Sequence, residues 1–278
     1  MSAGRVRDAL RGALEAFAAL WSRPLPDADL RAPALVFAPH QDDETLGCGG
    51  FIALKRAQGV PVKVVFMTDG RTSHARWLDG DELARRRRGE ALAACAALGV
   101  AEGDVLFLDL RDGELAGSLP AAVERVAWLL REHPGHLLLA PYEHDVTPDH
   151  VATFRAVTGA VAAQPAGASW TLLEYPVWFW HHWPWVCPLA DRSLLRTRTL
   201  GGAVVRRCRD LTARVDVAAG LDAKRAALAR HRTQMERQDG QADWPVLADV
   251  ARGTWLRAFF TGHEHFRRRR LPAGRAAR

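Results

Sequence analysis

The sequence predicts an α/β protein with a Rossmann-like, mostly parallel sheet, helices on both faces and a smaller aromatic-rich C-terminal lobe. Short continuous apolar runs alternate with segments of helical apolar spacing over the first 165 residues. Buried parallel strands form continuous apolar runs because both of their faces are covered, and strand–helix alternation is typical of a doubly wound sheet. The alternation stops near residue 165, which predicts an added lobe.

The first 165 residues contain four predicted strands and four predicted helices in alternation. The strands are expected at 34–38, 61–67, 105–110 and 136–140. The helices are expected at 46–57, 80–98, 119–132 and 149–163. Glycine lies just beyond each of the first three helices, at Gly59, Gly99 and Gly135, where helices commonly end.

The C-terminal third has a different pattern. We expect a partly β-like aromatic segment at 170–186, a pair of strands within 202–216 and a helix at 219–233. These boundaries predict four regions: an N-terminal helical extension (1–30), the Rossmann-like core (31–165), a lobe that completes the domain and its substrate cleft (166–266) and a solvated basic tail (267–278).

Composition and charge exclude several classes of protein. The chain of 278 residues is 48% hydrophobic and 25% charged, which is ordinary for a folded globular protein. Its formal net charge of +6 comes from the last twelve residues, which hold six arginines and no acid. A nucleic-acid footprint would cover a face of the domain, so we expect no nucleic-acid partner. The sequence contains no uncharged apolar run of about eighteen residues, so we expect no membrane-spanning helix.

Cellular location and cysteine chemistry follow from similar observations. The N-terminal segment mixes arginines, Asp8 and Glu15 into its apolar residues, which favours an amphipathic helix over a signal peptide. We therefore expect a cytoplasmic protein. The cysteines lie far apart and form no close pairs, so we expect them to be reduced; they are Cys48, Cys95, Cys187 and Cys208.

Two loops rich in histidine and carboxylate follow the first and fourth predicted strands. The first carries His40, Asp42, Asp43 and Glu44, and the second carries Glu143, His144, Asp145, Asp149 and His150. Ligands of doubly wound sheets bind at the carboxyl ends of the strands, where both loops lie. Imidazole nitrogens and carboxylate oxygens are ligands that zinc prefers. His40, Asp43 and His150 are the expected metal ligands.

Asp42 points away from its neighbour Asp43, which makes it a candidate general base beside the metal. The residues by themselves leave a second interpretation open. In it, Asp42, Asp43 or Thr45 caps the helix that follows, and Thr147 or Asp149 caps the later one.

Five ordered segments resemble the PIG-L/LmbE-like N-deacetylase family. The segment ALVFAPHQDDETLGCGG (34–50) resembles its first motif and TPDHVATFRAV (147–157) its second. Between them, MTDGRTSH (67–74), RRGEALAACAALGV (87–100) and FLDLRDGEL (107–115) follow the family's order and spacing. The resemblance covers about residues 33–160 and weakens beyond residue 170.

This resemblance implies a Rossmann-like hydrolase that removes the acetyl group from an N-acetylglucosamine-type sugar and releases acetate. It implies that His40, Asp43 and His150 hold Zn²⁺, with Fe²⁺ as another candidate metal. It also implies that Asp42 takes a proton from the attacking water. The family usually has a histidine where this chain has Thr147, so the acid or oxyanion-stabilising group is either this hydroxyl or His144.

Further polar residues are candidates for contact with substrate. They are Arg71, Asp112 and Arg88. The alternatives are an exposed loop arginine at position 71 and helix ion pairs from Arg88 to Glu90 or Glu82. Glu44 is expected to orient its neighbours, and Asp149 to hold an imidazole in position.

The glycines of the first motif, Gly47, Gly49 and Gly50, lack the spacing of a dinucleotide fingerprint and predict close helix–sheet packing instead. The cluster of Trp178, Trp180, Trp183 and Trp185 has two interpretations. Indole rings make platforms for sugars, and they also fill the core of a lobe, which we favour here.

We expect a small amino sugar or glycoconjugate as the partner. Contact of Arg267–Arg270 with a membrane surface is an alternative that we do not favour. Two other functions compete with the deacetylase. One is a metal-dependent amidase for another acyl group or a non-sugar amine. The other is a non-enzymatic module that binds sugar or lipid.

Overall fold

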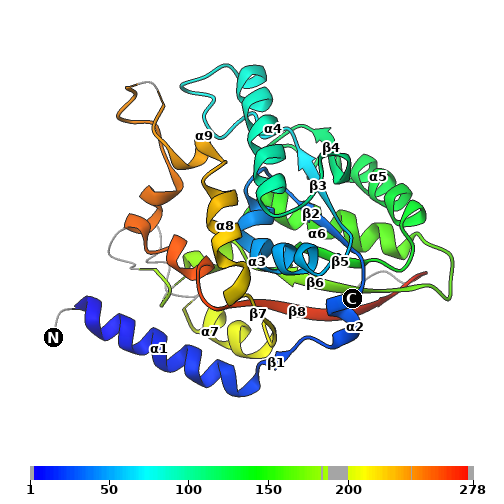
Figure 1. The fold of residues 1–278 in the computed structure, drawn as a ribbon, viewed down its shortest axis with the longest axis horizontal. Helices are drawn as coiled ribbons and strands as arrows, with labels where there is room; N and C mark the ends of the chain where they lie inside the picture. Colours follow the sequence, from blue (N-terminus) through cyan, green and yellow to red (C-terminus); the bar gives the residue numbers. More distant parts are fainter. Residues whose placement is uncertain (1–2, 183, 187–199, 239, 275–278) are drawn as a thin grey trace.

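A computed structural model describes residues 3–182, 184–186, 200–238 and 240–274. Its centre is one eight-stranded sheet in the order β1-β7-β8-β6-β5-β2-β3-β4 (Figure 1). The pairs from β4 to β6 are parallel, and β8 is antiparallel to both of its neighbours. The predicted α/β class with a mostly parallel sheet is confirmed.

The predicted core strands lie within one residue of their expected bounds. They are β2 (Ala34–Ala38), β3 (Val62–Thr68), β4 (Val105–Leu110) and β5 (Leu137–Pro141). The remaining strands are β1 (Arg23–Pro24), β6 (Ser169–Tyr175), β7 (Ala213–Asp216) and β8 (His263–Pro272). All five residues of β2 are buried, as expected for a strand covered on both faces.

Helices cover both faces of the sheet (Figure 1). The core helices are α3 (Asp43–Ala57), α4 (Gly80–Ala97), α5 (Leu119–Glu132) and α6 (Pro148–Ala162). Val36 belongs to the hydrophobic cluster on the side of α3 and α4, whereas its neighbour Phe37 belongs to the cluster on the side of α5 and α6. Alternate residues of a strand point to opposite faces, so the central strand serves both layers.

Close packing explains the glycines at the start of α3. A Cβ atom at Gly47 would lie 2.1 Å from the ring of Tyr175, and one at Gly50 would lie 2.7 Å from Val217. The helix is kinked at Cys48, and the carboxylate of Glu264 accepts the amide hydrogen bond of Gly50 at 2.8 Å. The predicted close helix–sheet contact is confirmed.

The C-terminal lobe differs from the expectation in two places. Residues 202–216 do not form two strands, because α7 (Leu200–Arg209) precedes β7. Its buried residues Ala203 and Arg207 are four apart, which is a helical spacing. The helix expected at 219–233 is divided into α8 (Leu221–Leu228) and α9 (Arg232–Met235). The break brings the fully buried His231 against Glu44 of the core.

Arg267–Arg270 do not form a tail, because they lie within β8 and pair with β6. Successive arginines point to opposite faces of this strand. Arg267 and Arg269 contact Glu143, and Arg268 contacts Asp29. Three of the four arginines are therefore paired with acids that are distant in sequence, and Arg270 donates to the hydroxyl of Ser169, which corrects the expectation of a solvated end. Trp183 and Cys187 lie outside the described residues.

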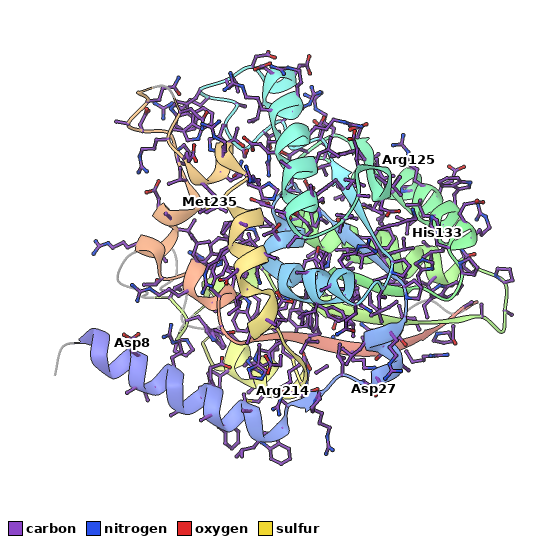
Figure 2. The ribbon with its side chains drawn as sticks, viewed as in Figure 1. Asp8, Asp27, Arg125, His133, Arg214 and Met235 are labelled. Carbon is purple, nitrogen blue, oxygen red and sulfur yellow. The ribbon has the colours of Figure 1, made fainter. Side chains whose placement is uncertain are left out.

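The N-terminal region contains α1 (Ala3–Trp21) and α2 (Asp27–Arg31). Helix α1 lies along the edge of the molecule beside α7 (Figure 1). The side chain of Arg214 in β7 lies near the end of α1 (Figure 2). It donates hydrogen bonds to the carbonyls of Ala19 and Ser22. Within the described residues, none of the helices combines the length and apolarity that a bilayer span requires.

The described residues also form short 3-10 helices. They are η1 (Glu102–Asp104), η2 (Trp178–His181), η6 (Ala218–Gly220), η7 (Leu247–Gly253) and η8 (Leu256–Phe259).

Candidate metal centre

The two loops rich in histidine and carboxylate meet at one end of the sheet. Strands β2 and β5 are parallel neighbours, so the segments that follow them emerge side by side. His40 and Asp43 follow β2 and begin α3, and His150 lies in the first turn of α6 after β5. The three side chains predicted to bind metal converge here.

Both imidazoles approach the same carboxylate oxygen. His40 Nδ1 and His150 Nε2 each lie 3.2 Å from Asp43 Oδ2. The His150 ring is fully buried, and its Nε2 has no hydrogen-bond partner among the described residues. A buried, unpartnered ring nitrogen beside a carboxylate is the arrangement expected of a metal ligand. The donor set of two nitrogens and one oxygen suits a borderline divalent cation.

The opposite nitrogen of each imidazole is held by another carboxylate. His150 Nδ1 lies 2.8 Å from Asp145. His40 Nε2 lies 3.2 Å from Asp112 and 3.4 Å from Asp149. Such outer carboxylates fix the ring orientation and the tautomer of metal-ligating histidines.

Asp145 is itself fixed in place by the backbone that follows β6. Its carboxylate accepts hydrogen bonds from the amides of Val177 at 3.2 Å and Trp178 at 3.1 Å, and from that of Phe179. The aromatic segment and the imidazole of His150 are therefore oriented by the same group.

A second group of potential ligands shares His40 and uses Asp112 and Asp149 instead. These carboxylates already accept other hydrogen bonds. Asp149 accepts the amide of Gly113 at 2.7 Å, and Asp112 accepts the hydroxyl of Thr72 at 2.7 Å. The group of His40, Asp43 and His150 fits a metal better, because it contains the buried nitrogen that lacks a partner.

The charge of the site also favours a cation. Burial by itself would lower the pKa of His150, but Asp43 and Asp145 raise it to about 9. Burial by itself would raise the pKa of Asp43, but the two imidazoles hold it well below its usual range. The negative potential that favours a protonated imidazole would equally favour a divalent ion.

Asp42 adopts a strained backbone conformation at the start of α3, with φ 147°. Burial raises the pKa of its carboxyl group to about 6, although Arg87 opposes the shift. Its amide donates to Glu44 at 3.1 Å, so Glu44 orients its neighbour as expected. Strain of this kind is typical of functional sites. Asp42 and Thr147 occupy N-cap positions, yet neither side chain makes a capping hydrogen bond.

A cavity of about 220 Å³ opens at this centre. His40, Asp42 and Asp43 form one part of its wall, and Thr147 lies in it with a buried hydroxyl that has no partner among the described residues. Trp178 stacks on Trp255 within the wall, with ring centroids 4.7 Å apart and planes inclined by 21°. The cavity therefore combines the ionisable groups with an aromatic surface.

Some predicted site residues are brought to this cavity and others are not. Asp112 lines it. The side chain of His144 is 40% exposed and lies 3.2 Å from Glu143, outside the lining. Arg71 pairs with Asp69 and Asp81, also outside the lining.

Arg88 is half-exposed and pairs with Asp109, whereas the preceding Arg87 is buried and lines the cavity. Arg87 donates to the backbone carbonyl of Gln41 at 2.6 Å and lies 3.6 Å from the carboxylate of Asp42. Arg87, and not the predicted Arg88, is therefore the member of the arginine run that lines the cavity. Leu83, Arg87 and Ala91 are buried positions four residues apart, so helical phase was the signal that could have identified it.

The comparison with known proteins agrees with the geometry. The family model described as GlcNAc-PI de-N-acetylase, PIG-L, matches residues 35–161. A deacetylase of 1D-myo-inositol 2-acetamido-2-deoxy-α-D-glucopyranoside from Nocardia farcinica is 30% identical, over 86% of this chain and 92% of the relative. The chain belongs to the PIG-L family. A deacetylase of the same description from Rhodococcus jostii is 28% identical, over 78% and 86% of the two chains.

Solved structures share the PIG-L fold. The N,N'-diacetylchitobiose deacetylase of Pyrococcus horikoshii has a TM-score of 0.59 at 24% identity, over 86% of this chain and 84% of that one. A 4-carboxy-2-hydroxymuconate hydratase from Pseudomonas putida has a TM-score of 0.55 at 18% identity, over 85% and 95%. Because a hydratase has the same fold, the architecture alone does not define the reaction, which depends on the residues of the site.

Proposed function

We propose that this protein is a zinc-dependent N-deacetylase of an N-acetylglucosamine-type sugar or glycoconjugate. The observation that carries the proposal is the convergence of His40, His150 and Asp43 at a cavity that Asp42 also lines; His150 itself is buried behind the wall. Zinc is the metal of choice for two imidazoles and one carboxylate, and ferrous iron is the alternative. The relatives named above support the reaction class.

Different residues at the site would have different roles in amide hydrolysis. When bound by His40, Asp43 and His150, the metal would supply Lewis acidity towards the amide carbonyl. Asp42 would accept the proton of the attacking water and return it to the departing nitrogen, so that the acetyl C–N bond breaks to give acetate and a free amine. Its burial favours this role, because it brings the carboxyl pKa closer to neutrality.

Thr147 is the group best placed to assist at the carbonyl oxygen. Thr147 lines the cavity, and its buried hydroxyl has no competing partner among the described residues. A hydroxyl can donate a hydrogen bond to a developing oxyanion, although it is a poor proton donor at neutral pH. His144 would have to leave Glu143 and move into the cavity to replace it.

A sugar suits the remaining wall. The stacked indoles of Trp178 and Trp255 provide an aromatic face, and Asp112 and Ser73 provide polar groups in the same cavity. Rings of this kind pack against the apolar faces of sugars while polar groups bind the hydroxyls. The substrate of the Nocardia relative, an N-acetylglucosaminyl inositol, is therefore the first compound to test.

Acetate release from that compound tests the proposal. Asp42→Asn should retain the bound metal but lose about 10²- to 10⁴-fold in turnover, the usual contribution of a general base. The matched control is Asp109→Asn, which alters an exposed aspartate that pairs with Arg88 outside the cavity. It should turn over like the wild type.

The outcome also separates the competing functions. Release of propionate or butanoate from N-acyl analogues, with no release of acetate, would favour the amidase for another acyl group. Full activity of Asp42→Asn would contradict the role of Asp42. Tight sugar binding without hydrolysis of any amide, in protein that holds metal, would contradict the deacetylase and favour the binding module.

A further inference from the structure

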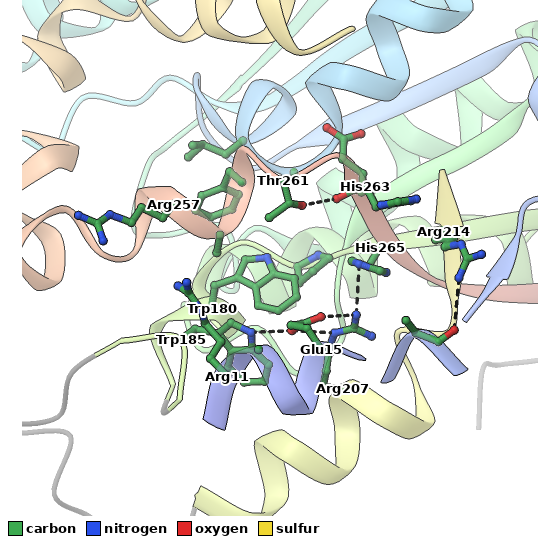
Figure 3. A pocket seen from close by; sticks show the side chains of 18 of the residues that line it. Arg11, Glu15, Trp180, Trp185, Arg207, Arg214, Arg257, Thr261, His263 and His265 are labelled. Atoms are coloured by element: carbon green, nitrogen blue, oxygen red, sulfur yellow. Dashed lines mark hydrogen bonds and ion pairs between the residues drawn. The ribbon is translucent and has the colours of Figure 1, made fainter. Parts of the chain in front are cut away.

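A second and larger cavity, of about 410 Å³, lies away from the candidate metal centre. It is enclosed by α1, by the aromatic segment after β6, and by the stretch from η8 into β8 (Figure 3). Of the residues that line the metal-centre cavity, it shares only Leu46. No group of potential metal ligands among the described residues lies in this second cavity.

The wall of this cavity carries an excess of positive charge. It contains five permanently basic side chains and two carboxylates; the basic ones are Arg11, Arg207, Arg214, Lys224 and Arg257. Both carboxylates are already paired. Glu15 lies 2.7 Å from Arg207, and Glu264 lies 2.7 Å from Lys224. Three positive charges are thus left without a compensating acid in the wall.

The three remaining arginines are available to a ligand to different degrees. Among the described residues, Arg214 donates to backbone carbonyls and has no acidic partner. Arg11 is half-buried and Arg257 is exposed at the rim. Among the described residues, neither of these two has a carboxylate partner. Guanidinium groups bind carboxylates through paired hydrogen bonds, so the cavity is suited to an anion.

The other part of the wall is apolar. The buried indoles of Trp180 and Trp185 meet edge to face at 5.1 Å, and Phe259 adds a further ring. The indole nitrogen of Trp185 donates to Glu15 at 2.9 Å, which fixes that ring next to the Arg207–Glu15 pair (Figure 3). The described tryptophans of the predicted cluster therefore line two different cavities, because Trp178 lines the metal-centre cavity.

A buried histidine lies beside these basic groups. His265 lies 3.2 Å from Arg207. Burial lowers its pKa to about 3, and Arg207, His263 and Arg214 contribute to the shift. Cationic neighbours disfavour a further positive charge here, and the same field would attract an anion.

We propose that this second cavity binds a small organic anion that consists of a carboxylate and an alkyl or aromatic group. The carboxylate would pair with Arg11 and Arg257, and the apolar group would pack on Trp180 and Trp185. The ligand would not contact the residues proposed to bind metal, so this site is separate from the deacetylase reaction.

Isothermal titration calorimetry of the metal-loaded protein tests the proposal, with octanoate as the probe. Octanamide, which has the same chain without the charge, should bind at least about tenfold more weakly, because charge-assisted hydrogen bonds to arginine are lost. Inorganic phosphate should also bind at least about tenfold more weakly, because it has no apolar group.

Amino-acid substitutions test whether octanoate binds in this second cavity. Arg11→Gln combined with Arg257→Gln should weaken octanoate binding at least about tenfold. Arg131→Gln is the matched control, because it removes an exposed arginine of α5 that does not line the cavity. His150→Ala should also keep the octanoate affinity, which separates this test from the proposed function. The single variant Arg257→Gln changes an exposed side chain, so its octanoate affinity can be measured even if the double variant does not fold; it should also be weaker than that of the wild type.

Several results would overturn the proposal. Equal binding of octanoate and octanamide would show that the negative charge does not contribute to the affinity. Equal binding of octanoate and phosphate would show that the apolar group does not contribute. Octanoate binding that survives loss of both arginines, or that disappears in His150→Ala, would place the ligand elsewhere. Absence of octanoate binding would reject the site.

Discussion

His150 Nε2 lies 3.2 Å from Asp43 Oδ2, yet no hydrogen bond joins the two atoms. The other nitrogen of the same ring is held at 2.8 Å by Asp145. Asp145 thus fixes the orientation of the ring through Nδ1, while Nε2 is directed at the carboxylate of Asp43. This relationship favours a metal ion between the two residues over a simple ion pair.

Asp145→Asn should weaken metal binding about 10- to 100-fold, the usual effect of losing an outer carboxylate. The amide has no charge to stabilise the imidazole and can present a donor to it. Competition with a chromophoric chelator measures the affinity. Asp104→Asn is the control, because Asp104 pairs with Lys63 away from the site. Unchanged metal affinity in Asp145→Asn would show that Asp145 does not orient a ligand.

Arg87 and Arg88 should differ sharply in their effects on stability. Replacement of the buried Arg87 by Met leaves the carbonyl of Gln41 without its donor and Asp42 without its cation, and should cost about 3 kcal/mol. Replacement of Arg88 by Met removes an exposed ion pair with Asp109 and a stack on Phe107, and should cost about 1 kcal/mol or less. Urea unfolding of both variants provides the comparison; equal losses would contradict it.

This pair of arginines also shows where sequence analysis reaches its limit. The core strands were predictable because parallel strands buried on both faces are continuous apolar runs, and β2 and β4 have the bounds expected. The order of strand and helix then placed His40 and His150 at one end of the sheet. Within the run of four arginines, however, the residue type does not identify the buried member, and only the helical phase of Leu83 and Ala91 does.

Residues beyond 165 were harder to predict because their partners are distant in sequence. Arg267 and Arg269 lie in a strand that pairs with β6, and their charges are compensated by Glu143 and Glu174, which are distant from them in the chain. Asp145 was visible in its loop, but its role depends on backbone amides that follow β6. Long-range pairing of this kind leaves no periodicity in the sequence.

Gly47→Ala and Gly89→Ala should change stability in opposite directions. A Cβ at Gly47 would meet the buried ring of Tyr175, whose hydroxyl is fixed by a 2.7 Å hydrogen bond to Phe37, so the substitution should destabilise by about 1–3 kcal/mol. No atom lies within 4 Å of a Cβ at Gly89, which is exposed within α4, so alanine there should stabilise by about 0.5–1 kcal/mol. Thermal unfolding measures both. Destabilisation of similar size at both sites would contradict the packing described for α3.

His265 should make stability dependent on pH. Its pKa is about 3 in the folded protein against an ordinary value of 6.5, so between these values the unfolded chain binds a proton that the folded chain does not. The contribution of this residue to the free energy of unfolding therefore rises with pH across that interval and is constant above it. The difference between wild type and His265→Gln, measured by urea unfolding from about pH 4 to 7, should rise with pH. A difference that is independent of pH would contradict the burial of a neutral imidazole.

The central claim is that His40, Asp43 and His150 hold the metal on which amide hydrolysis depends. Elemental analysis of wild type and His150→Ala tests it most directly, with acetate release from the N-acetylglucosaminyl inositol measured on the same samples. We predict about one zinc or iron per wild-type chain, and the loss of both metal and acetate release in His150→Ala. Metal and activity that persist in His150→Ala, or wild-type protein that takes up no divalent metal when it is supplied, would contradict the claim.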